Sequence, residues 1–249
     1  MEETNISQEQ NPLGTAPVGG LISKFAIPAI ISMLVSALYN IVDQIFIGQG
    51  VGMLGNAATN VAFPVTTIAT ALALLLGIGG ASNYNLEMGA GREKKASSIA
   101  GTALSTLVIT GAILAVAVLL FLRPLLGLFG ATTDVMPYAV DYLGITAVGL
   151  PFYVLSIGGN HIVRADRSPT YSMTCVLTGA VINTILDPLF IFGFGWGIKG
   201  AAWATVIGQV VSGILVIIYF GKFRKMYLET GMLKPSAECL KAIVSLGMA

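Results

Sequence analysis

The stretch Ala96–Leu122, ASSIAGTALSTLVITGAILAVAVLLFL, contains no charged residue and is longer than the ~20 apolar residues that a helix needs to cross a bilayer. Charge-free runs also extend from Gln44 to Leu86 and from Gly200 to Gly221. Of the 249 residues in the chain, 55% are hydrophobic and 10% are charged, whereas a soluble domain carries ~25% charged residues. The sequence therefore predicts an integral membrane protein.

The apolar runs predict six membrane-spanning helices. Backbone amides in lipid must be satisfied inside a helix or a closed barrel, and the alternating ~10-residue segments of a barrel are absent, so an all-α fold follows. We expect the spans at Leu21–Ile47, Asn56–Leu86, Ala96–Leu122, Met136–Gly158, Thr170–Phe192 and Gly200–Phe220. The chain then divides into a polar tail at 1–20, a six-helix lobe at 21–221, a linker at 222–237 and the start of a seventh helix at 238–249.

Basic residues gather at alternate ends of the expected spans, and this asymmetry predicts the orientation in the membrane. One end collects Lys24, Arg92, Lys94, Lys95, Arg164, Arg167, Lys222, Arg224, Lys225, Lys234 and Lys241. The opposite end has Arg123 and Lys199. We therefore expect a multi-pass protein of the cell membrane whose amino terminus is cytoplasmic, and no basic residue is expected in the interior of a span.

Several function classes lack the residues that they require. A net charge of +1 without a continuous basic patch argues against nucleic-acid binding. An intramembrane enzyme would need an acid cluster, a His-Glu-x-x-His pair or a Ser and His dyad inside the spans, and none is present, so we expect no enzymatic activity. His161, the single histidine, is expected at a helix boundary and offers no histidine-based metal site, and no cofactor is expected. Each GxGxxG match, at Gly50 to Gly55 and at Gly195 to Gly200, lacks the acidic residue of a dinucleotide site.

Asp43 and Asp187 lie within the first and fifth expected spans, where a carboxylate is costly and by default marks an ion or substrate pathway. Counting ~1.5 Å per residue places both toward the outer end of their helices, so they are expected to face each other. Asn183 lies one turn before Asp187, on nearly the same helix face. Asn40 likewise lies three residues before Asp43. The alternative is that each aspartate only caps a wet helix end.

A weak internal repeat relates the two spans that carry these aspartates. Asn40-Ile-Val-Asp43 followed by Phe46-Ile47-Gly48 resembles Asn183-Thr-Ile-Leu-Asp187 followed by Phe190-Ile191-Phe-Gly193, with one residue inserted. Both stretches continue into Gly-x-Gly-x-Gly-x-x-Gly. Parallel repeats of this kind occur in transporters, and chance similarity between apolar segments is the alternative.

The expected carboxylate pair has a definite chemistry. Burial disfavours the charged form of a carboxyl group, and a second carboxylate nearby disfavours it further, so such a pair can hold one proton near neutral pH. The oxygens of Asp43, Asp187 and Asn183 are also ligands that sodium prefers. The sequence does not separate proton from sodium.

Pro28 lies in the same expected helix as Asp43 and removes a backbone hydrogen bond there, which bends a helix. It is the better candidate for a moving bend among the prolines of the spans. A static kink is the alternative, because membrane helices tolerate proline.

Several of these motifs together resemble the multidrug and toxic compound extrusion family, and the bacterial branch in particular. The residues that carry the resemblance are Pro28, Asn40-x-x-Asp43, Gly55-Asn-Ala-Ala, Phe63-Pro64, Asn183-Thr-Ile-Leu-Asp187-Pro188 and Gly200-Ala-Ala-Trp-Ala-Thr205. The similarity extends from about Leu21 to the end of the chain.

The resemblance implies one lobe of a twelve-helix antiporter that uses a proton or sodium gradient to expel amphipathic, often cationic compounds. It implies that Asp43 and Asp187 are the cation-linked carboxylates and that Asn183, Tyr142 and Thr205 are their polar companions. It also joins the bend at Pro28 to protonation of Asp43. The expected partners are the lipid bilayer, small organic cations and a carboxy-terminal lobe.

Two other functions stay open. A lipid-linked oligosaccharide flippase shares this helical plan, but such proteins often line their cavity with Arg or Lys, which the expected spans lack. A non-transporting fragment or assembly subunit is the other alternative.

Overall fold

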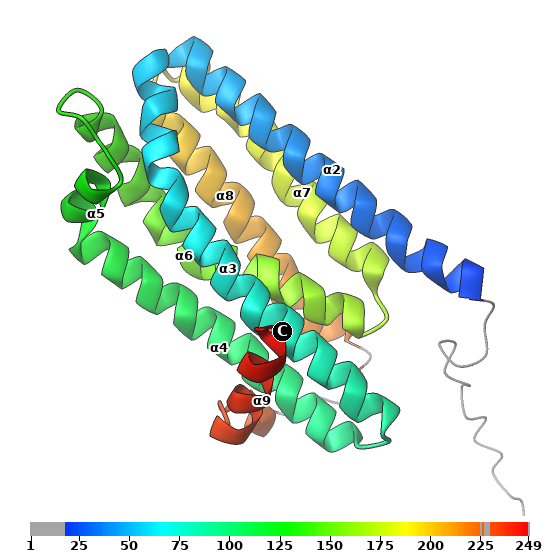
Figure 1. The fold of residues 1–249 in the computed structure, drawn as a ribbon. Coiled ribbons are helices and arrows are strands. Elements are labelled where there is room, and N and C mark those ends of the chain that lie inside the picture. Colours follow the sequence, from blue (N-terminus) through cyan, green and yellow to red (C-terminus); the bar gives the residue numbers. More distant parts are fainter. Residues whose placement is uncertain (1–17, 225, 227–229, 249) are drawn as a thin grey trace, which may run out of the picture.

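The computed structural model describes residues 18–224, 226 and 230–248. All regular structure in this part of the chain is helical, and six of its helices are long and apolar enough to cross a membrane (Figure 1). The prediction of an all-α membrane protein with six spans is therefore confirmed. The predicted tail at 1–20 lies mostly outside the described residues, as do 225 and 227–229 of the predicted linker and the last residue of the predicted seventh helix.

Five of the six spanning helices are longer than the sequence predicts, whereas α7 is shorter because its α-helical part ends at Pro188. The six helices are α2 (Val18–Gly50), α3 (Met53–Gly89), α4 (Glu93–Leu120), α6 (Met136–Ala165), α7 (Pro169–Pro188) and α8 (Gly197–Ile218). Shorter elements are α5 (Leu122–Leu128), the π-helical turns η1 (Leu189–Gly193) and η2 (Tyr219–Phe223), the 3₁₀ turn η3 (Thr230–Leu233) and α9 (Ala237–Gly247).

Local sequence explains several of the boundaries. Gly52 separates α2 from α3 with a φ of 84°, a backbone conformation that favours glycine. Pro169 is the first residue of α7. A backbone N–H at that position would have no acceptor within the helix, so proline costs no hydrogen bond there. Pro188 ends the α-helical part of α7, and the chain continues as η1. Asp187 thus lies where the regular helix gives way to a π-helical turn.

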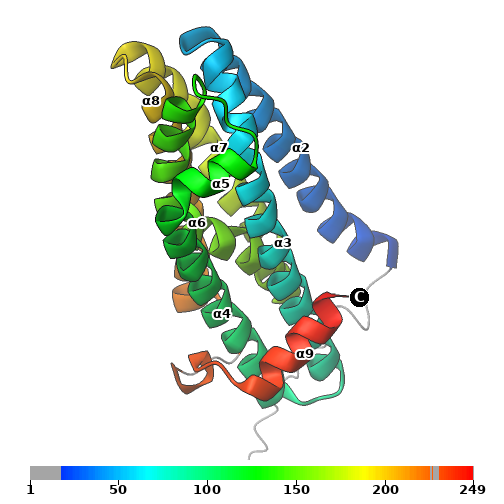
Figure 2. The same cartoon turned by 60° about the vertical axis from the view of Figure 1, so that its left-hand side comes forward.

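The bundle is centred on α6, which packs against α3, α4 and α8. The first helix, α2, has a peripheral position and packs mainly along α7, while it has few contacts with α3. Figure 2 shows the amino-terminal part of α2 splayed away from α3, although the two helices meet at the turn that joins them. The helix that carries Asp43 is therefore the one that the rest of the lobe holds least.

Small residues let the central helices approach each other closely. A Cβ atom added to Gly77 of α3 would lie 2.5 Å from Cα of Gly158 in α6. A Cβ atom added to Gly111 of α4 would lie 2.6 Å from Cα of Pro151, also in α6. Without a hydrophobic driving force between helices in lipid, such close packing supplies much of the attraction. The α3, α4 and α6 helices thus form a tightly packed block.

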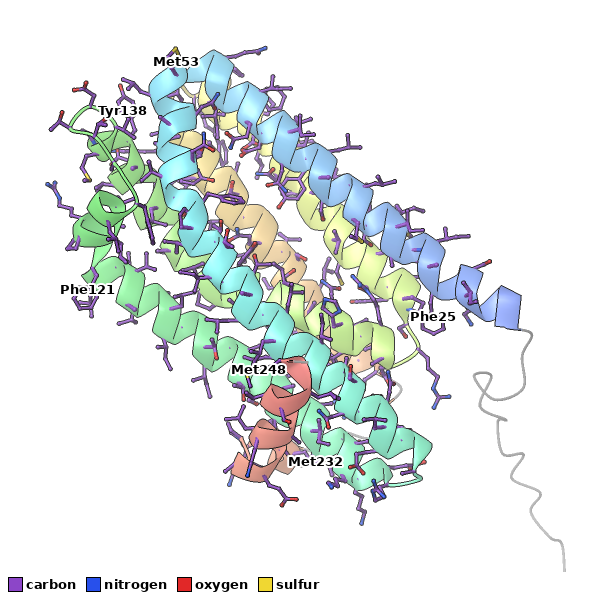
Figure 3. All side chains as sticks on the ribbon, in the orientation of Figure 1. Phe25, Met53, Phe121, Tyr138, Met232 and Met248 are labelled. Carbon is purple, nitrogen blue, oxygen red and sulfur yellow. The ribbon has the colours of Figure 1, made fainter. Side chains whose placement is uncertain are left out.

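The outer surface is apolar. Met33 on α2 is 73% exposed, and Phe121, between α4 and α5, lies on the outside of the bundle (Figure 3). Large hydrophobic side chains that face outward from long helices are the surface that lipid or another apolar partner covers. The exposed apolar surface supports the assignment to the membrane.

The helix α9 packs across α3 and α4 (Figure 2). Ile243 of α9 is fully buried, and the side-chain amide of Asn83 donates to the carbonyl of Ala242 at 3.0 Å. Cys239 Sγ lies 3.8 Å from Ser98 Oγ of α4. In the described chain α9 is an eleven-residue amphipathic helix, and its extension into a seventh span stays a prediction.

The close approach of α3 and α6 predicts that Gly77→Val lowers the free energy of unfolding by about 1–3 kcal/mol, because the new side chain meets backbone that cannot yield. Thermal unfolding of the detergent-solubilised protein measures the change. Gly89→Val in the same helix is the control, since a Cβ atom there meets nothing within 4 Å. Equal melting temperatures for the two variants would contradict the packing described above.

The contact between α4 and α9 predicts that Ser98→Cys forms a disulfide with Cys239 under mild oxidation, because the two side-chain atoms are near the reach of a disulfide. Mass spectrometry of the digested membrane protein detects the linked peptides. The double variant Ser98→Cys with Cys239→Ser should give no link. An oxidised Ser98→Cys sample in which both thiols stay free would show that α9 does not lie on α4.

Candidate functional site

Two carboxyl groups from neighbouring helices meet inside the lobe. Asp43 of α2 is 7% exposed and Asp187 of α7 is fully buried. The two side chains lie close enough to interact directly with each other. The alternative that each aspartate caps a wet helix end does not fit this burial.

Neither carboxylate has a basic partner. In the described chain the salt bridges join Arg92 and Lys95 to Glu87 and Lys199 to Asp141, all outside this cluster. Ionised carboxylates buried together without a cation are strongly unfavourable. The pair therefore needs a proton or a small cation from outside the protein.

Asn183 completes a group of oxygen atoms around the pair. Its Nδ2 donates to Asp187 Oδ1 at 3.4 Å, and its side chain is 3% exposed. Asp43 Oδ1, Asp187 Oδ2 and Asn183 Oδ1 are buried without a hydrogen-bond partner among the described residues. Three such oxygens in one place form a donor set of the kind that a hard monovalent cation or a shared proton would satisfy.

Tyr142 of α6 and Thr205 of α8 lie beside the carboxylates. Their side chains are neighbours, and the phenol of Tyr142 lies close enough to Asp43 and Asp187 to interact electrostatically with both. The structure therefore brings these two residues, which the family resemblance named, to the same site. Four helices contribute to the cluster.

Asn40 does not join the carboxylates as Asn183 does. It is exposed, and its amide donates to the carbonyl of Ser36 at 2.6 Å. The amide side chain that lies beside Asp43 is that of Gln44, and its oxygen accepts a hydrogen bond of 3.1 Å from Thr59 Oγ1. Gln44 and Thr59 thereby link the site to α3.

Sequence reasoning missed Tyr39 as well as Gln44. Tyr39 lies one turn before Asp43 on α2, and its phenol interacts electrostatically with Asp43 and Asp187. The spacing of four residues from Asp43 was the signal that could have found Tyr39. Gln44 gave no signal, because an adjacent residue is expected on another face of the helix.

An apolar cluster closes one end of the site. Ile47 lies four residues after Asp43 and Ile191 four residues after Asp187, and both are buried in a cluster with Ile198 and Ala201. This apolar cluster lies one helical turn beyond the carboxylates, on the side of the turn between α2 and α3.

A polar cavity of about 410 Å³ extends from the site between α2, α6, α7 and α8. Its polar lining consists of Ser32, Ser36, Tyr39, Asn40, Tyr153, Ser156, Asn160, His161, Arg164, Asn183, Thr205, Gln209 and Ser212. Ser156 and Ser212 are joined by a hydrogen bond of 2.6 Å across α6 and α8. The cavity is large enough for a small organic molecule and reaches Asn183 at the carboxylate site.

His161 and Arg164 are placed differently from the sequence expectation. The predicted fourth span ended at Gly158, whereas α6 continues to Ala165, so both residues lie inside a candidate membrane span and line the cavity. Both residues lie in the last five residues of that helix, so the expectation that no basic residue lies in the interior of a span stays a prediction. Gly158 is a packing residue against Gly77, not a helix end.

Pro28 is buried within α2, which is continuous from Val18 to Gly50. Its carbonyl oxygen accepts a hydrogen bond of 2.7 Å from Ser32 Oγ, so the helix around the proline has side-chain support. The role of Pro28 as a moving bend stays a prediction.

The fold and the cavity define a multi-pass helical membrane protein with a buried acidic site open to a polar cavity. Residues 28–189 match the family MatE. The chain belongs to this family of membrane transporters.

Curated relatives cover nearly the whole chain. Multidrug export protein MepA of Staphylococcus haemolyticus is 29% identical over 225 residues, which are 90% of this chain and 50% of that protein. MepA of Staphylococcus aureus is 28% identical over 234 residues, 94% of this chain and 52% of that protein. A protein of Shewanella oneidensis named FAD transporter is 34% identical over 222 residues, 85% of this chain and 48% of that protein. The chain thus spans about half the length of these relatives.

Solved structures of related transporters share the fold. A MATE protein in a straight conformation superposes with a TM-score of 0.84 at 30% identity, covering 91% of this chain and 51% of that one. A bent conformation gives a TM-score of 0.83 at 30% identity, with the same two coverages of 91% and 51%. A transporter of the MOP superfamily from Pyrococcus furiosus, described as having a binding pocket of reverse polarity, gives 0.84 at 30% identity over 91% of this chain and 50% of that one. The lobe is therefore that of a MATE transporter.

Proposed function

We propose that this chain is the amino-terminal lobe of a twelve-helix antiporter that exports amphipathic, often cationic compounds across the cell membrane. A proton or sodium ion supplies the energy, and no other cofactor is needed. The amino terminus lies in the cytoplasm, and a second lobe completes the transport pathway. The observation that carries the proposal is the buried pair of Asp43 and Asp187, which has no basic partner among the described residues.

Coupling follows from the charge of the pair. With a proton or sodium bound among Asp43, Asp187 and Asn183, α2 and α7 pack side by side as observed. Loss of that cation leaves two negative charges in contact, and their repulsion acts directly between the two helices. Because α2 has few other contacts in the lobe, it is the element that repacks, and Pro28 is where we place its bend.

Substrate release is linked to the same event through the cavity. Asn183 lines the cavity and also donates to Asp187, so a change at the carboxylate alters the cavity wall. Linkage requires that an ion which weakens substrate binding is itself bound less tightly when substrate is present. Export driven by an inward ion gradient follows from that reciprocity.

A second candidate function is export of a compound that carries an anionic group. Arg164 in the cavity wall is the observation that favours it, and one relative is named as a transporter of FAD, whose phosphates are anionic. The same observation weakens the argument against a lipid-linked oligosaccharide flippase, which rested on the absence of basic residues from the spans. The names of the MepA relatives support drug export as the leading function.

The proposal predicts that Asp43→Asn with Asp187→Asn in the full-length transporter abolishes gradient-driven efflux, because the neutral amides no longer bind and release a cation. Efflux of a fluorescent organic cation from vesicles is measured under an imposed pH gradient and, separately, an imposed sodium gradient. The gradient that drives efflux by the unaltered protein identifies the coupling ion.

The matched control is Asp141→Asn, which removes a partly exposed carboxylate paired with Lys199 at 3.4 Å, outside the cluster. We expect this variant to transport like the unaltered protein. Efflux by the double variant with unchanged rate and unchanged dependence on the gradient would rule out the carboxylate pair as the coupling site.

A further inference from the structure

The cavity changes its polarity along its length. At one end Asn183 lies against the carboxylates. In the middle, Asn160 Oδ1 and Gln209 Oε1 are buried acceptors without a donor among the described residues. At the other end His161 and Arg164 line the wall. A simple cation would use only the first two of these regions.

Arg164 is oriented by a contact with α7. Its Nε donates to Ser172 Oγ at 3.0 Å, and Ser172 is fully buried. No carboxylate in the described chain forms a salt bridge with Arg164. The nearby Asp166 carboxylate instead accepts hydrogen bonds from Tyr84 at 3.4 Å and Tyr219 at 2.8 Å. A half-buried guanidinium therefore borders the cavity with donors that Ser172 does not use.

Two further features suit this end of the cavity to an anion, since the neutral imidazole of His161 can donate a hydrogen bond and the first turn of α7 offers backbone N–H groups. His161 lies three residues before Arg164 on α6, so both side chains are on one face of the helix. Ser172 lies in the first turn of α7. This turn contains no acidic residue and no side-chain cap, so the backbone amide groups of the turn keep their partial positive charge. These features favour an anion, and Arg geometry matches a carboxylate or phosphate.

We propose that the His161 and Arg164 end of the cavity binds an anionic group, a carboxylate or a phosphate, of the transported compound. The substrates then include molecules with a positive group toward Asn160, Gln209 and Asn183 and a negative group at Arg164. Ser172 and Asn183 are about 16 Å apart along α7 at ~1.5 Å per residue, so one organic molecule fits between the two ends. This assignment rests on the proposed export function and names a substrate class for it.

The test compares two dyes that differ in one charge. Tetramethylrhodamine carries a free carboxylate and a delocalised cation, while its methyl ester is a simple cation. Binding of each dye to the 249-residue chain in phosphatidylcholine nanodiscs is followed by fluorescence polarisation. We expect Arg164→Gln to weaken binding of the free acid about 10-fold, as loss of a hydrogen bond to a charged group does, and to leave the ester unchanged.

Controls separate a substrate contact from a structural role. Arg164→Lys keeps the charge and should restore most of the affinity for the free acid, and Arg123→Gln removes an exposed charge away from the cavity and should change neither dye. If Arg164→Gln does not fold, His161→Glu places a carboxylate on the same face and should weaken the free acid alone. The proposal would be overturned if Arg164→Gln lowered the affinity for both dyes equally, or if it left the affinity for the free acid unchanged.

A lipid headgroup is the other source of an anion at this site. Repeating the comparison in nanodiscs that contain phosphatidylglycerol distinguishes the two. If the effect of Arg164→Gln on the free acid persists, the substrate is the anion; if it disappears, a lipid phosphate occupies Arg164 and the proposal is wrong. Dye binding in nanodiscs needs no ion gradient. A negative binding result therefore does not test cation coupling at Asp43 and Asp187, and a negative efflux result does not test anion binding at Arg164.

Discussion

The structure depends on how the lobe accommodates two acidic side chains that face each other across the contact between α2 and α7. Asp43 and Asp187 are buried, and the described residues provide no basic group to neutralise them. The cost of an uncompensated buried charge is several kcal/mol, which is comparable with the packing energy of a helix pair. The charge state of the pair is therefore able to decide how α2 sits on α7.

The rest of the lobe is built so that this energy acts on one helix. The α3, α4 and α6 helices meet through glycines and alanines, with backbone close to backbone, and such packing has little room to adjust. In contrast, α2 is peripheral, mostly exposed along its length, and attached chiefly to α7. In the proposed mechanism, a change of charge at the contact therefore moves α2 against the α3, α4 and α6 block.

The fold and the centre of the site could be predicted from the sequence, because both depend on which residue types occur and on how they are spaced along a helix. Long charge-free runs identify spans, and a carboxylate inside a span is conspicuous, so Asp43, Asp187 and Asn183 could be predicted to meet. The failures came from features that need the neighbouring helix. Gly158 ends an apolar run, so the sequence predicted a helix end there. In the structure Gly158 packs against Gly77, and α6 continues past it and places His161 and Arg164 in the cavity wall. Asn40 was predicted to accompany Asp43, but it bonds to its own helix at Ser36, and the amide beside Asp43 is that of Gln44, for which the sequence predicted no role.

In the proposed antiporter, Asn183 is the side chain that would join ion binding to substrate binding. Its amide nitrogen donates to Asp187, while its carbonyl oxygen is unpartnered and the residue lines the cavity. When the carboxylate is ionised it holds the amide nitrogen strongly, since hydrogen bonds to charged groups are about twice as strong as neutral ones. A proton or sodium ion on Asp187 weakens that hold, and the amide then turns more readily, which rearranges the acceptors that a bound cation uses. Competition between the coupling ion and the substrate thus needs no long-range pathway, because a single buried amide contacts both sites.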